Sequence, residues 1–482
     1  MKLLAIDIGA SSGRGILGEL DGETLSLTEI HRFENHPVEI DGHKHWDIDR
    51  LRGELIECLR KAPHAESVGI DTWGVDYGYI GKDGELIGRP FAYRDERTEP
   101  MVDAVHARIP FERLYAIAGI QFMRLNTIYQ VADDVANRPD VLDRADRMLF
   151  MPDLLSYLLT GSPVTEYSIA STSEMLDCRS RDWSDEILGT LGYPRRLLGQ
   201  VTQPGAHRAA LRPEIASRTG CRSTVISSGG HDTASAVAAA PLADADSMYI
   251  SSGTWSLAGM ELEQPILTDA AREANFTNEG GVGGTIRFLK NVMGLWLVQE
   301  LQRLWATEGN VLTFADICDE ARKAQPFVSL FDANHEALLA PDDMRSAIQT
   351  LCRAAGEPAP EGVGPLARSV FESLAMAYRV CVEQLERLTG RSVGRIHIVG
   401  GGVQNRLLCQ MTADASGRTV YAGPVEATAI GNLLIQAVAL GSVADLDAAR
   451  GIVRATFPLE DYTPKDQAEW AAAWERYGEL TG

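Results

Sequence analysis

One carboxylate stands beside a turn whose composition suits a phosphate. Asp7 follows a short apolar run and precedes Gly9–Gly15, a segment of glycine, alanine, serine and arginine. A carboxylate at the end of a buried strand can hold hydrated Mg²⁺, and N–H groups freed by glycine can surround phosphate oxygens. Ser11, Ser12 and Arg14 would add hydroxyls and a positive charge. A plain hairpin with solvated serines is the alternative, since no Walker pattern G-x-x-x-x-G-K-[ST] occurs.

A second carboxylate, Asp232, lies in the glycine-rich segment Ser228–Thr233, between a predicted strand and an alanine-rich helix. An aspartate placed there can accept a proton from a substrate hydroxyl, as a general base does. His231 precedes it and can hydrogen-bond the same substrate. Because aspartate is also a common residue at helix N-termini, the segment alone leaves a structural role open.

The segment 71–76, DTWGVD, has the mixture of groups that a sugar site needs. Asp71 and Asp76 flank Trp73 and Gly74. Sugar hydroxyls require acceptors, whereas the apolar C–H face of a sugar packs on an aromatic ring. The alternative is that Trp73 belongs to the core and the aspartates cap turns.

Two segments in the second half of the chain can also contact a ligand. In 397–405, HIVGGGVQN, a predicted strand ends in three glycines before a helix, so backbone can approach a planar or phosphorylated ligand closely. In 275–299, we interpret Met293 and Trp296 as helix packing residues. Four polar side chains lie among glycines and aromatics there: Asn278, Glu279, Asn291 and Gln299.

Other groupings point to less chemistry. His43 and His45 are potential metal ligands, but no third ligand stands at a useful spacing, so we expect a surface turn. The serines before His231 lack the nucleophile elbow G-x-S-x-G. From Asp461 onward we expect an amphipathic, solvated helix.

Strands that alternate with helices must position these groups. The clearest helix is 366–388, with apolar residues on one face, Pro365 in its first turn and Gly390 just after its end. This alternation predicts an α/β fold. Short β-rich segments bounded by glycine predict strands at 68–71, 225–227, 248–251 and 395–399.

The chain also repeats a pattern after about half its length. Leu3–Leu20 and Met248–Leu262 are each an apolar strand, a small polar turn and a second apolar strand, and Asp7 aligns with Ser251. The repeat favours a duplicated domain. We place the boundary near Pro241, which predicts an N-terminal domain at 1–241 and a C-terminal domain at 242–482.

Composition narrows the class of protein. The 482 residues carry a net charge of −22, which disfavours binding to nucleic acid or anionic membrane. The apolar run at the N-terminus is shorter than an export signal needs, and no apolar run is long enough to span a membrane. The seven cysteines are scattered without a C-x-x-C pair, so we expect a reducing compartment, the cytoplasm.

Taken in order, the motifs resemble those of the FGGY carbohydrate kinases, from Leu3 to about Gly441. They are DIGASSGR, DTWGVD, GGHDTASA, SSGTWS, HIVGGGVQN and GPVEATAIGN. The resemblance implies two actin-like (ribonuclease H-like) ATPase domains of α/β type flanking a central cleft, with ATP and Mg²⁺ as cofactors. Within the family, FTNEGGVGGTIRFLKNVMGLW and GIQFMRLNT are most similar to members that phosphorylate L-rhamnulose.

The resemblance also implies residue roles. Asp232 becomes the general base, and Asp7 organises Mg²⁺–ATP. Nucleotide contacts are implied for Ala10, Ser11, Ser12, Gly13, Arg14, Thr254, Gln299, Gly401 and Gly402, and the glycine-rich segment adds Asn405. Sugar contacts are implied for Gly74, His231, Asp232, Thr233 and Asn291, and the segment 71–76 adds Trp73 and Asp76. The N-terminal domain would bind the sugar and the C-terminal domain the nucleotide.

The implied reaction is ATP-dependent phosphorylation of L-rhamnulose at its 1-hydroxyl, giving L-rhamnulose 1-phosphate and ADP in L-rhamnose catabolism. A kinase for another ketose, L-fuculose or xylulose, stays open. So does an actin-like ATPase that phosphorylates no sugar. The expected partners are small molecules, and the expected assembly is a monomer or homodimer.

Overall fold

The computed structural model describes residues 1–481 and divides into two compact units. Unit 1 comprises Met1–Pro241, Glu261–Phe288 and Ala427–Phe457, and unit 2 comprises Leu242–Met260, Leu289–Glu426 and the chain from Pro458. The first segment of unit 1 thus ends at Pro241, but two later segments return to this unit. The assignment of sugar and nucleotide to the domains 1–241 and 242–482 stays a prediction.

The main sheet of unit 1 has the strand order β13-β14-β6-β1-β2-β3. Its central strand, β1, is buried along all but its first residue, as expected for a strand covered on both faces. β1 pairs antiparallel with β2 and parallel with β6. The bounds are β1 (Lys2–Ile8), β2 (Ser12–Asp21), β3 (Thr24–Glu34), β6 (Ser67–Thr72), β13 (His207–Ala210) and β14 (Thr224–Ile226).

The second large sheet has the order β17-β18-β16-β15-β19-β20-β21. β15 pairs antiparallel with β16 and parallel with β19, and β20 continues the parallel run before the antiparallel β21. From β18 to β21 this order repeats that of unit 1 from β3 to β13, so the predicted duplication is confirmed. The bounds are β15 (Ser247–Ser252), β16 (Trp255–Leu262), β17 (Thr277–Gly280), β18 (Ile286–Met293), β19 (Arg395–Val399), β20 (Thr419–Ala422) and β21 (Glu460–Tyr462).

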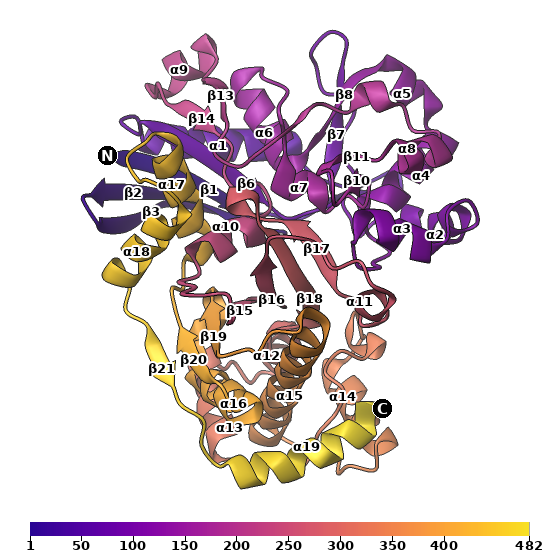
Figure 1. Ribbon diagram of the computed structural model, residues 1–482, viewed down its shortest axis with the longest axis vertical. Helices are drawn as coiled ribbons and strands as arrows, with labels where there is room; N and C mark the ends of the chain where they lie inside the picture. The colour runs from indigo at the N-terminus through magenta and orange to yellow at the C-terminus, as the bar shows by residue number, and fades with distance from the viewer. Residues whose placement is uncertain (482) are drawn as a thin grey trace. The chain divides into compact units, whose positions relative to one another are not determined.

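Two helices lie against each other on the main sheet of unit 1 (Figure 1). They are α10 (Asp232–Ala239) and α17 (Ala427–Ala439), and α17 also packs on β1 and β6. Their approach is so close that a methyl group at Gly431 would overlap the carbonyl oxygen of Ser235. Because α10 begins at Asp232, this packing helps to set the position of that carboxylate. Three further helices of unit 1 are α1 (Ile48–Lys61), α9 (Pro213–Thr219) and α18 (Leu446–Thr456).

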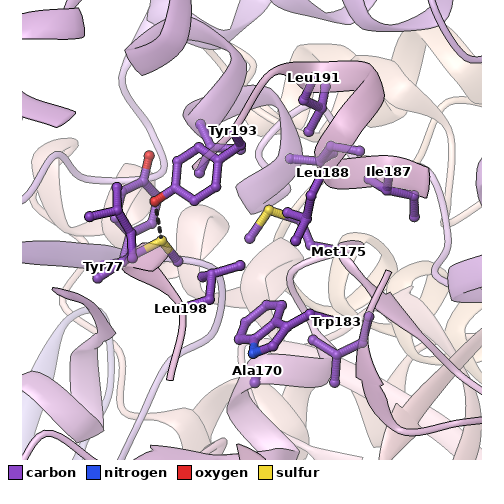
Figure 2. Close-up of a cluster of buried hydrophobic side chains, with 14 of the residues drawn as sticks. Tyr77, Ala170, Met175, Trp183, Ile187, Leu188, Leu191, Tyr193 and Leu198 are labelled. Atoms are coloured by element: carbon purple, nitrogen blue, oxygen red, sulfur yellow. Dashed lines mark hydrogen bonds between the residues drawn. The ribbon is translucent and has the colours of Figure 1, made fainter. Parts of the chain in front are cut away.

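Residues between β6 and β13 form a mostly helical extension of unit 1 with its own apolar core. Figure 2 shows part of that core, where Trp183 and Tyr193 lie among aliphatic side chains. The Tyr193 hydroxyl donates a hydrogen bond to the sulfur of Met148 at 3.1 Å. Its helices are α2 (Glu99–His106), α3 (Phe111–Ala118), α4 (Thr127–Asn137), α5 (Pro139–Arg144), α6 (Met151–Thr160), α7 (Tyr167–Ser171) and α8 (Asp185–Leu191). Its strands are β7 (Tyr77–Gly81), β8 (Ala145–Phe150), β9 (Thr165–Glu166), β10 (Leu176–Asp177), β11 (Asp182–Trp183) and β12 (Val201–Thr202).

The long predicted helix of unit 2 is confirmed as α15 (Val363–Thr389), which ends at Gly390 in the left-handed conformation. Met293 is a correction, because it ends strand β18 and only Trp296 opens a helix. The remaining helices are α11 (Asp269–Glu273) in unit 1 and α12 (Trp296–Thr307), α13 (Phe314–Lys323), α14 (Met344–Ala354), α16 (Arg406–Ser416) and α19 (Gln467–Thr481) in unit 2.

The structure also bears on the predictions made for the histidine pair, the cysteines and membrane spans. The predicted surface turn at His43 and His45 is a correction, because both residues form strand β5 (His43–His45) of a two-stranded hairpin with β4 (Val38–Ile40), and His43 Nδ1 lies 3.0 Å from an Asp95 oxygen. All seven cysteines are free and buried. Within the described chain, none of the helices combines the length and the apolarity that crossing a bilayer requires.

Candidate active site

The strand register of unit 1 brings three charged side chains together. Asp7 on β1 stands opposite Arg14 on β2 and beside Asp71 on β6. Arg14 donates to one oxygen of Asp7, Oδ2, from Nε at 3.0 Å and from Nη2 at 2.9 Å. Asp7 is 9% exposed, so this pair lies at the boundary between core and solvent.

Asp71 is fully buried and receives one hydrogen bond, from the amide of Asn432 to Oδ2. Among the described residues no donor reaches its Oδ1. Burial raises the pKa of Asp71 well above its usual range, and the neighbouring charge of Asp7 adds to the rise. Asn432 is held in turn by Gln436, whose amide donates to Asn432 Oδ1 at 2.7 Å and to the Leu4 carbonyl at 3.0 Å.

Asp232 is the first residue of α10, and its side chain is 32% exposed. Its Oδ1 accepts hydrogen bonds from the N–H of Thr233 and from Thr233 Oγ1, the latter at 3.0 Å. Within residues 1–481 no group donates to Oδ2, which leaves that oxygen for a substrate. Burial raises the pKa of Asp232 and Asp7 adds to this, while His231 opposes it. The arrangement suits a general base with one oxygen fixed and the other accessible.

The loop before α10 is tied to β6 and to a buried carboxylate. The Thr72 N–H donates to the Gly230 carbonyl at 2.9 Å, which joins the ends of β6 and this loop. Glu166 accepts a hydrogen bond from the Gly230 N–H at 2.9 Å. Burial raises the pKa of Glu166 to about 7, although its hydrogen bonds with Ser168 favour the ionised form. The strand that carries Asp71 and the loop that leads to Asp232 are therefore joined by a backbone hydrogen bond, and Glu166 holds that loop from its other side.

Asp76 is buried and organises an aromatic cluster. Its Oδ2 accepts hydrogen bonds from Trp46 Nε1 at 2.6 Å, Trp73 Nε1 at 2.9 Å and the Tyr93 N–H at 3.1 Å. Gln130 donates a fourth hydrogen bond, to Oδ1 at 3.1 Å. Burial raises the pKa of Asp76 to about 6, although all four hydrogen bonds lower it. Trp46 and Tyr93 were not predicted as site residues, since their link to Asp76 spans 30 and 17 positions.

Gly74 lies close to the side chains of His231 and Thr172. A Cβ there would lie 3.4 Å from His231 Nε2 and 3.5 Å from Thr172 Oγ1. Most of the predicted site residues belong to unit 1, namely Asp7, Arg14, Asp71, Trp73, Gly74, His231, Asp232 and Thr233. Asn291 differs, because it lies on the part of β18 in unit 2 and is half-buried. A ketose contact for Asn291 stays a prediction.

The carbonyl groups of the turn between β1 and β2 accept hydrogen bonds from within unit 1. The Gly9 N–H donates to the Ser12 carbonyl at 2.8 Å, and Asn35 donates to the Ser11 and Gly9 carbonyls at 2.9 and 2.8 Å. In the part of the chain that the structure describes, the N–H groups of Ala10 and Ser11 have no acceptor. Two unpaired N–H groups beside glycine form the kind of concavity that binds an anion.

Unit 2 has a comparable turn between β15 and β16. The Gly253 N–H donates to the Trp255 carbonyl at 2.9 Å, while the Leu295 and Trp296 N–H groups donate to the Gly253 and Thr254 carbonyls. The exposed Thr254 hydroxyl lies 3.4 Å from Gln299 Oε1. The predicted nucleotide contacts Thr254 and Gln299 are thus neighbours.

The glycine-rich turn after β19 packs directly on β15. A methyl group at Gly402 would overlap the Ser252 side chain, whereas Gly401 is exposed with open space around it. Asn405 accepts a hydrogen bond from the Leu408 N–H at 3.0 Å and so caps α16. That cap gives Asn405 a structural role, and a nucleotide contact for it stays a prediction.

The charge balance of the unit 1 site suits a hydrated divalent cation. Asp7 raises the pKa of both Asp71 and Asp232, which indicates negative charge only partly offset by Arg14. Mg²⁺ typically takes one or two carboxylates and keeps several waters. Arg14 occupies Oδ2 of Asp7, so Oδ1 is the oxygen of this carboxylate that could face such an ion. No larger group of three or more His, Cys, Asp or Glu side chains arranged for a metal occurs among residues 1–481.

Comparison with known proteins agrees with this arrangement. The models of the FGGY family of carbohydrate kinases match residues 2–239 with the N-terminal domain and residues 248–440 with the C-terminal domain. A rhamnulokinase from Bacteroides thetaiotaomicron is 43% identical over 478 residues, covering 98% of both chains. A rhamnulokinase from Bacillus subtilis is 40% identical, covering 97% of this chain and 96% of its own.

Solved structures share the fold at low identity. A ligand-bound xylulose kinase from Lactobacillus acidophilus has a TM-score of 0.81 and 16% identity, covering 99% of this chain and 97% of its own. Plasmodium falciparum glycerol kinase with ADP has a TM-score of 0.81 and 14% identity, covering 100% and 98%. The predicted fold class, two α/β domains of the actin-like (ribonuclease H-like) type, is confirmed. The duplicated sheets, the carboxylates on β1 and α10, and the match of both family models show that this chain belongs to the FGGY family of carbohydrate kinases.

Proposed function

We propose that this enzyme phosphorylates L-rhamnulose at its 1-hydroxyl with ATP, giving L-rhamnulose 1-phosphate and ADP. Rhamnulokinases that are 39–43% identical over at least 95% of this chain support the choice of substrate. The accessible carboxylate of Asp232 is the observation that carries the reaction type, because phosphoryl transfer to a sugar needs a base at the attacking hydroxyl.

In the proposed mechanism, Asp232 Oδ2 takes the proton of the 1-hydroxyl while that oxygen attacks the γ-phosphorus of ATP. The bond between the γ-phosphorus and the bridging oxygen breaks, and ADP leaves with that oxygen. Thr233 keeps Oδ1 occupied with two hydrogen bonds, so the side chain presents one defined oxygen. Positioning and charge neutralisation supply most of the catalysis in such a transfer.

Asp7 is the residue that would hold Mg²⁺, which when bound neutralises phosphate charge. Arg14 keeps the Asp7 carboxylate oriented through two bonds to a single oxygen. The free N–H groups of Ala10 and Ser11 would donate to phosphate oxygens. Unit 1 would bind the ketose through Gly74, His231 and Thr233, and unit 2 the nucleotide through Thr254, Gln299 and the turn at Gly401–Gly402. We also propose that the enzyme works in the cytoplasm, since all seven cysteines are free thiols.

Release of ADP with Mg²⁺–ATP tests the proposal against L-rhamnulose, L-fuculose, D-xylulose, L-ribulose, glycerol and no sugar. We expect fast release with L-rhamnulose and little with the others. A higher kcat/KM with another ketose would keep the kinase and its base but overturn the substrate. Equal ATP hydrolysis in every reaction, including the one without sugar, would overturn the kinase and favour an actin-like ATPase.

A further inference from the structure

Two buried charged side chains face one nitrogen of His231. Arg287 Nη2 lies 3.2 Å from His231 Nδ1, and Glu279 Oε2 lies 3.3 Å from the same nitrogen. The Arg287 side chain has no exposed surface, and that of Glu279 is 8% exposed. Glu279 lies in the polar segment 275–299, and neither Glu279 nor Arg287 has a part in the mechanism described above.

The guanidinium of Arg287 is held in three directions at once. Its Nε donates to the Gly280 carbonyl at 2.9 Å, its Nη1 lies 3.1 Å from Glu279 Oε2, and its Nη2 reaches His231. Glu279 and Gly280 lie on β17 and Arg287 on the neighbouring strand β18. Because the planar guanidinium is held at three points, it has little freedom to move away from the His231 ring.

The other nitrogen of His231 faces the reaction site. Nε2 lies 3.5 Å from Asp232 Oδ1 and would lie 3.4 Å from a Cβ at Gly74. The side chain of His231 is 12% exposed. The imidazole therefore connects the buried charges on β17 and β18 with the base on α10.

The contact with Arg287 decides which nitrogen carries the proton. A guanidinium has donors and no acceptor, so its hydrogen bond to Nδ1 requires a lone pair on that nitrogen. The proton of a neutral imidazole then lies on Nε2. Glu279 could take a proton from Nδ1 only in place of this bond. The charge of Glu279 is paired with Arg287, whose Nη1 lies 3.1 Å from Oε2, and the contacts with Arg287 and His231 together lower the pKa of Glu279 against the effect of its burial.

We propose that Arg287 is a positioning residue that holds His231 in the tautomer protonated on Nε2. His231 is then a hydrogen-bond donor beside Asp232 and not a second proton acceptor. Its Nε2–H lies beside Asp232 Oδ1 in the free enzyme and donates to an oxygen of the ketose in the complex. The catalytic consequence rests on the proposed function, in which Asp232 alone receives the hydroxyl proton.

The protonation of His231 can be read without any kinase assay. We would record nitrogen NMR spectra of the full-length protein labelled with ¹⁵N-histidine, and assign His231 by the signals missing from His231→Gln. The expected spectrum shows a protonated Nε2 and an unprotonated Nδ1, and Arg287→Gln should shift population toward protonation on Nδ1. A wild-type Nδ1 that carries a proton, in either a neutral or a doubly protonated ring, would overturn the proposal. If the wild type phosphorylates no ketose, the proposed function fails while this result still stands.

A double-mutant cycle separates positioning through His231 from a purely structural role. We expect Arg287→Gln to lower kcat by about 30-fold, within the range of coupled neighbours, with a smaller change in KM for the ketose. In the His231→Gln background the same substitution should cost less than about threefold, because a glutamine amide has a fixed donor and no tautomer. An equal loss in both backgrounds would overturn the proposal.

Two variants guard this cycle against loss of folding. Arg287→Lys keeps the charge beside Glu279 but cannot reach Gly280 and His231 together, so it should fold and lose activity in the His231 background only. Arg113→Gln removes an exposed arginine whose ion pair with Glu186 is half solvated. It should leave kcat and the His231 spectrum unchanged. Full activity of Arg287→Lys would contradict the proposal that the guanidinium of Arg287 positions His231.

Discussion

The β1–β2 hairpin of unit 1 and the β15–β16 hairpin of unit 2 close their turns in similar ways. The Gly9 N–H donates to the Ser12 carbonyl, and the Gly253 N–H donates to the Trp255 carbonyl. Each hairpin has a parallel strand beside its first strand, β6 in unit 1 and β19 in unit 2. The duplicated topology therefore places a short glycine turn at the same point of both sheets, although the turn after β15 is one residue shorter.

The side chains at matching register positions differ sharply. In unit 1, Asp7 stands opposite Arg14 and beside Asp71. In unit 2, the aligned Ser251 stands opposite Leu257 and beside Val399. The first turn can therefore organise a cation as well as phosphate oxygens, whereas the second offers backbone N–H groups and hydroxyls.

The helices that follow β14 and β20, which occupy matching places in the two sheets, extend this contrast. After β14, α10 begins with Asp232, whereas after β20, α17 begins with Ala427. α17 instead sends Asn432 and Gln436 to the strands of unit 1. The difference teaches that duplication supplied the backbone of both halves, and that divergence of a few side chains placed the carboxylates Asp7 and Asp232, to which we assign the metal and the base, in one of them.

The largest expected effect comes from removing the base. Asp232→Asn keeps the shape of the side chain and the bonds from Thr233 but cannot accept the hydroxyl proton. We expect kcat to fall by roughly 10²–10⁴-fold, as for the loss of a general base, with ATP affinity nearly unchanged by calorimetry. More than about a tenth of the wild-type kcat would remove Asp232 from this role.

The second prediction gives unit 1 the residue found in unit 2. Asp7→Ser removes the carboxylate that we assign to Mg²⁺, so the Mg²⁺ concentration for half-maximal activity should rise at least about tenfold. Arg14 also loses the carboxylate to which it donates two hydrogen bonds. An unchanged Mg²⁺ titration would show that Asp7 does not hold the metal.

The reciprocal change in unit 2 is the matched control for Asp7→Ser. Ser251→Asp places a carboxylate between Leu257 and Val399, where the register offers no arginine. We expect it to raise the KM for ATP by repulsion of phosphate and not to lower the Mg²⁺ requirement. A lower requirement would mean that the two hairpins are interchangeable for the metal.

Smaller effects are expected where glycine turns follow β6 and β19. Gly402→Ala forces the added methyl group into Ser252, so it should cost about 1–3 kcal/mol of stability and raise the KM for ATP. Gly401→Ala meets open space and should leave Tm unchanged. Gly74→Ala makes ordinary contacts with His231 and Thr172, so it should raise only the KM for the ketose. A lower Tm for Gly401→Ala than for Gly402→Ala would contradict this packing.

The elements that could be predicted from sequence are those with a local signal. The predicted strand 395–399 coincides with β19, and the predicted helix 366–388 lies within α15, because apolar spacing and flanking glycine or proline encode both. Met293 was misassigned because a short apolar run has no clear period, and strand and helix then look alike. The motifs around Asp7 and Asp232 are also local signals, because each is a continuous segment of a few residues.

The supporting contacts of the site could not be predicted, because they join distant positions. Asn432 reaches Asp71 across 361 residues, and Arg287 reaches His231 across 56. The return of 261–288 and 427–457 to unit 1 has the same origin, since both segments pack by tertiary contacts that leave no local pattern. Asn432 and Gln436 are amide side chains in a helix made mostly of small and apolar residues, and that composition is the one signal in the sequence that points to this contact.

The smallest expected effect concerns buried carboxyl groups, which also differ between the units. Glu174 in unit 1 accepts one hydrogen bond, from Asn126, and burial raises its pKa to about 8. Glu372 in unit 2 is bonded to Arg368 and the Phe327 N–H, and burial raises its pKa only to about 6. Each folded-state pKa exceeds the unfolded value of about 4.3, so the folded protein binds more protons. The stabilising contribution is full below that value and is lost as pH rises through the folded-state pKa.

Glutamine at either position removes this proton binding while keeping the shape of the side chain. Glu174→Gln should flatten the pH dependence of the unfolding free energy up to about pH 8, by at most about 1.4 kcal/mol for each pH unit. Glu372→Gln should flatten it only below about pH 6, where its carboxyl titrates. Urea unfolding of both variants between pH 5 and 8 measures the two windows. If Glu174→Gln left the slope between pH 6 and 8 unchanged, Glu174 would be ionised in the fold, and the orphaned oxygen Oε1 would need a donor that the described residues do not supply.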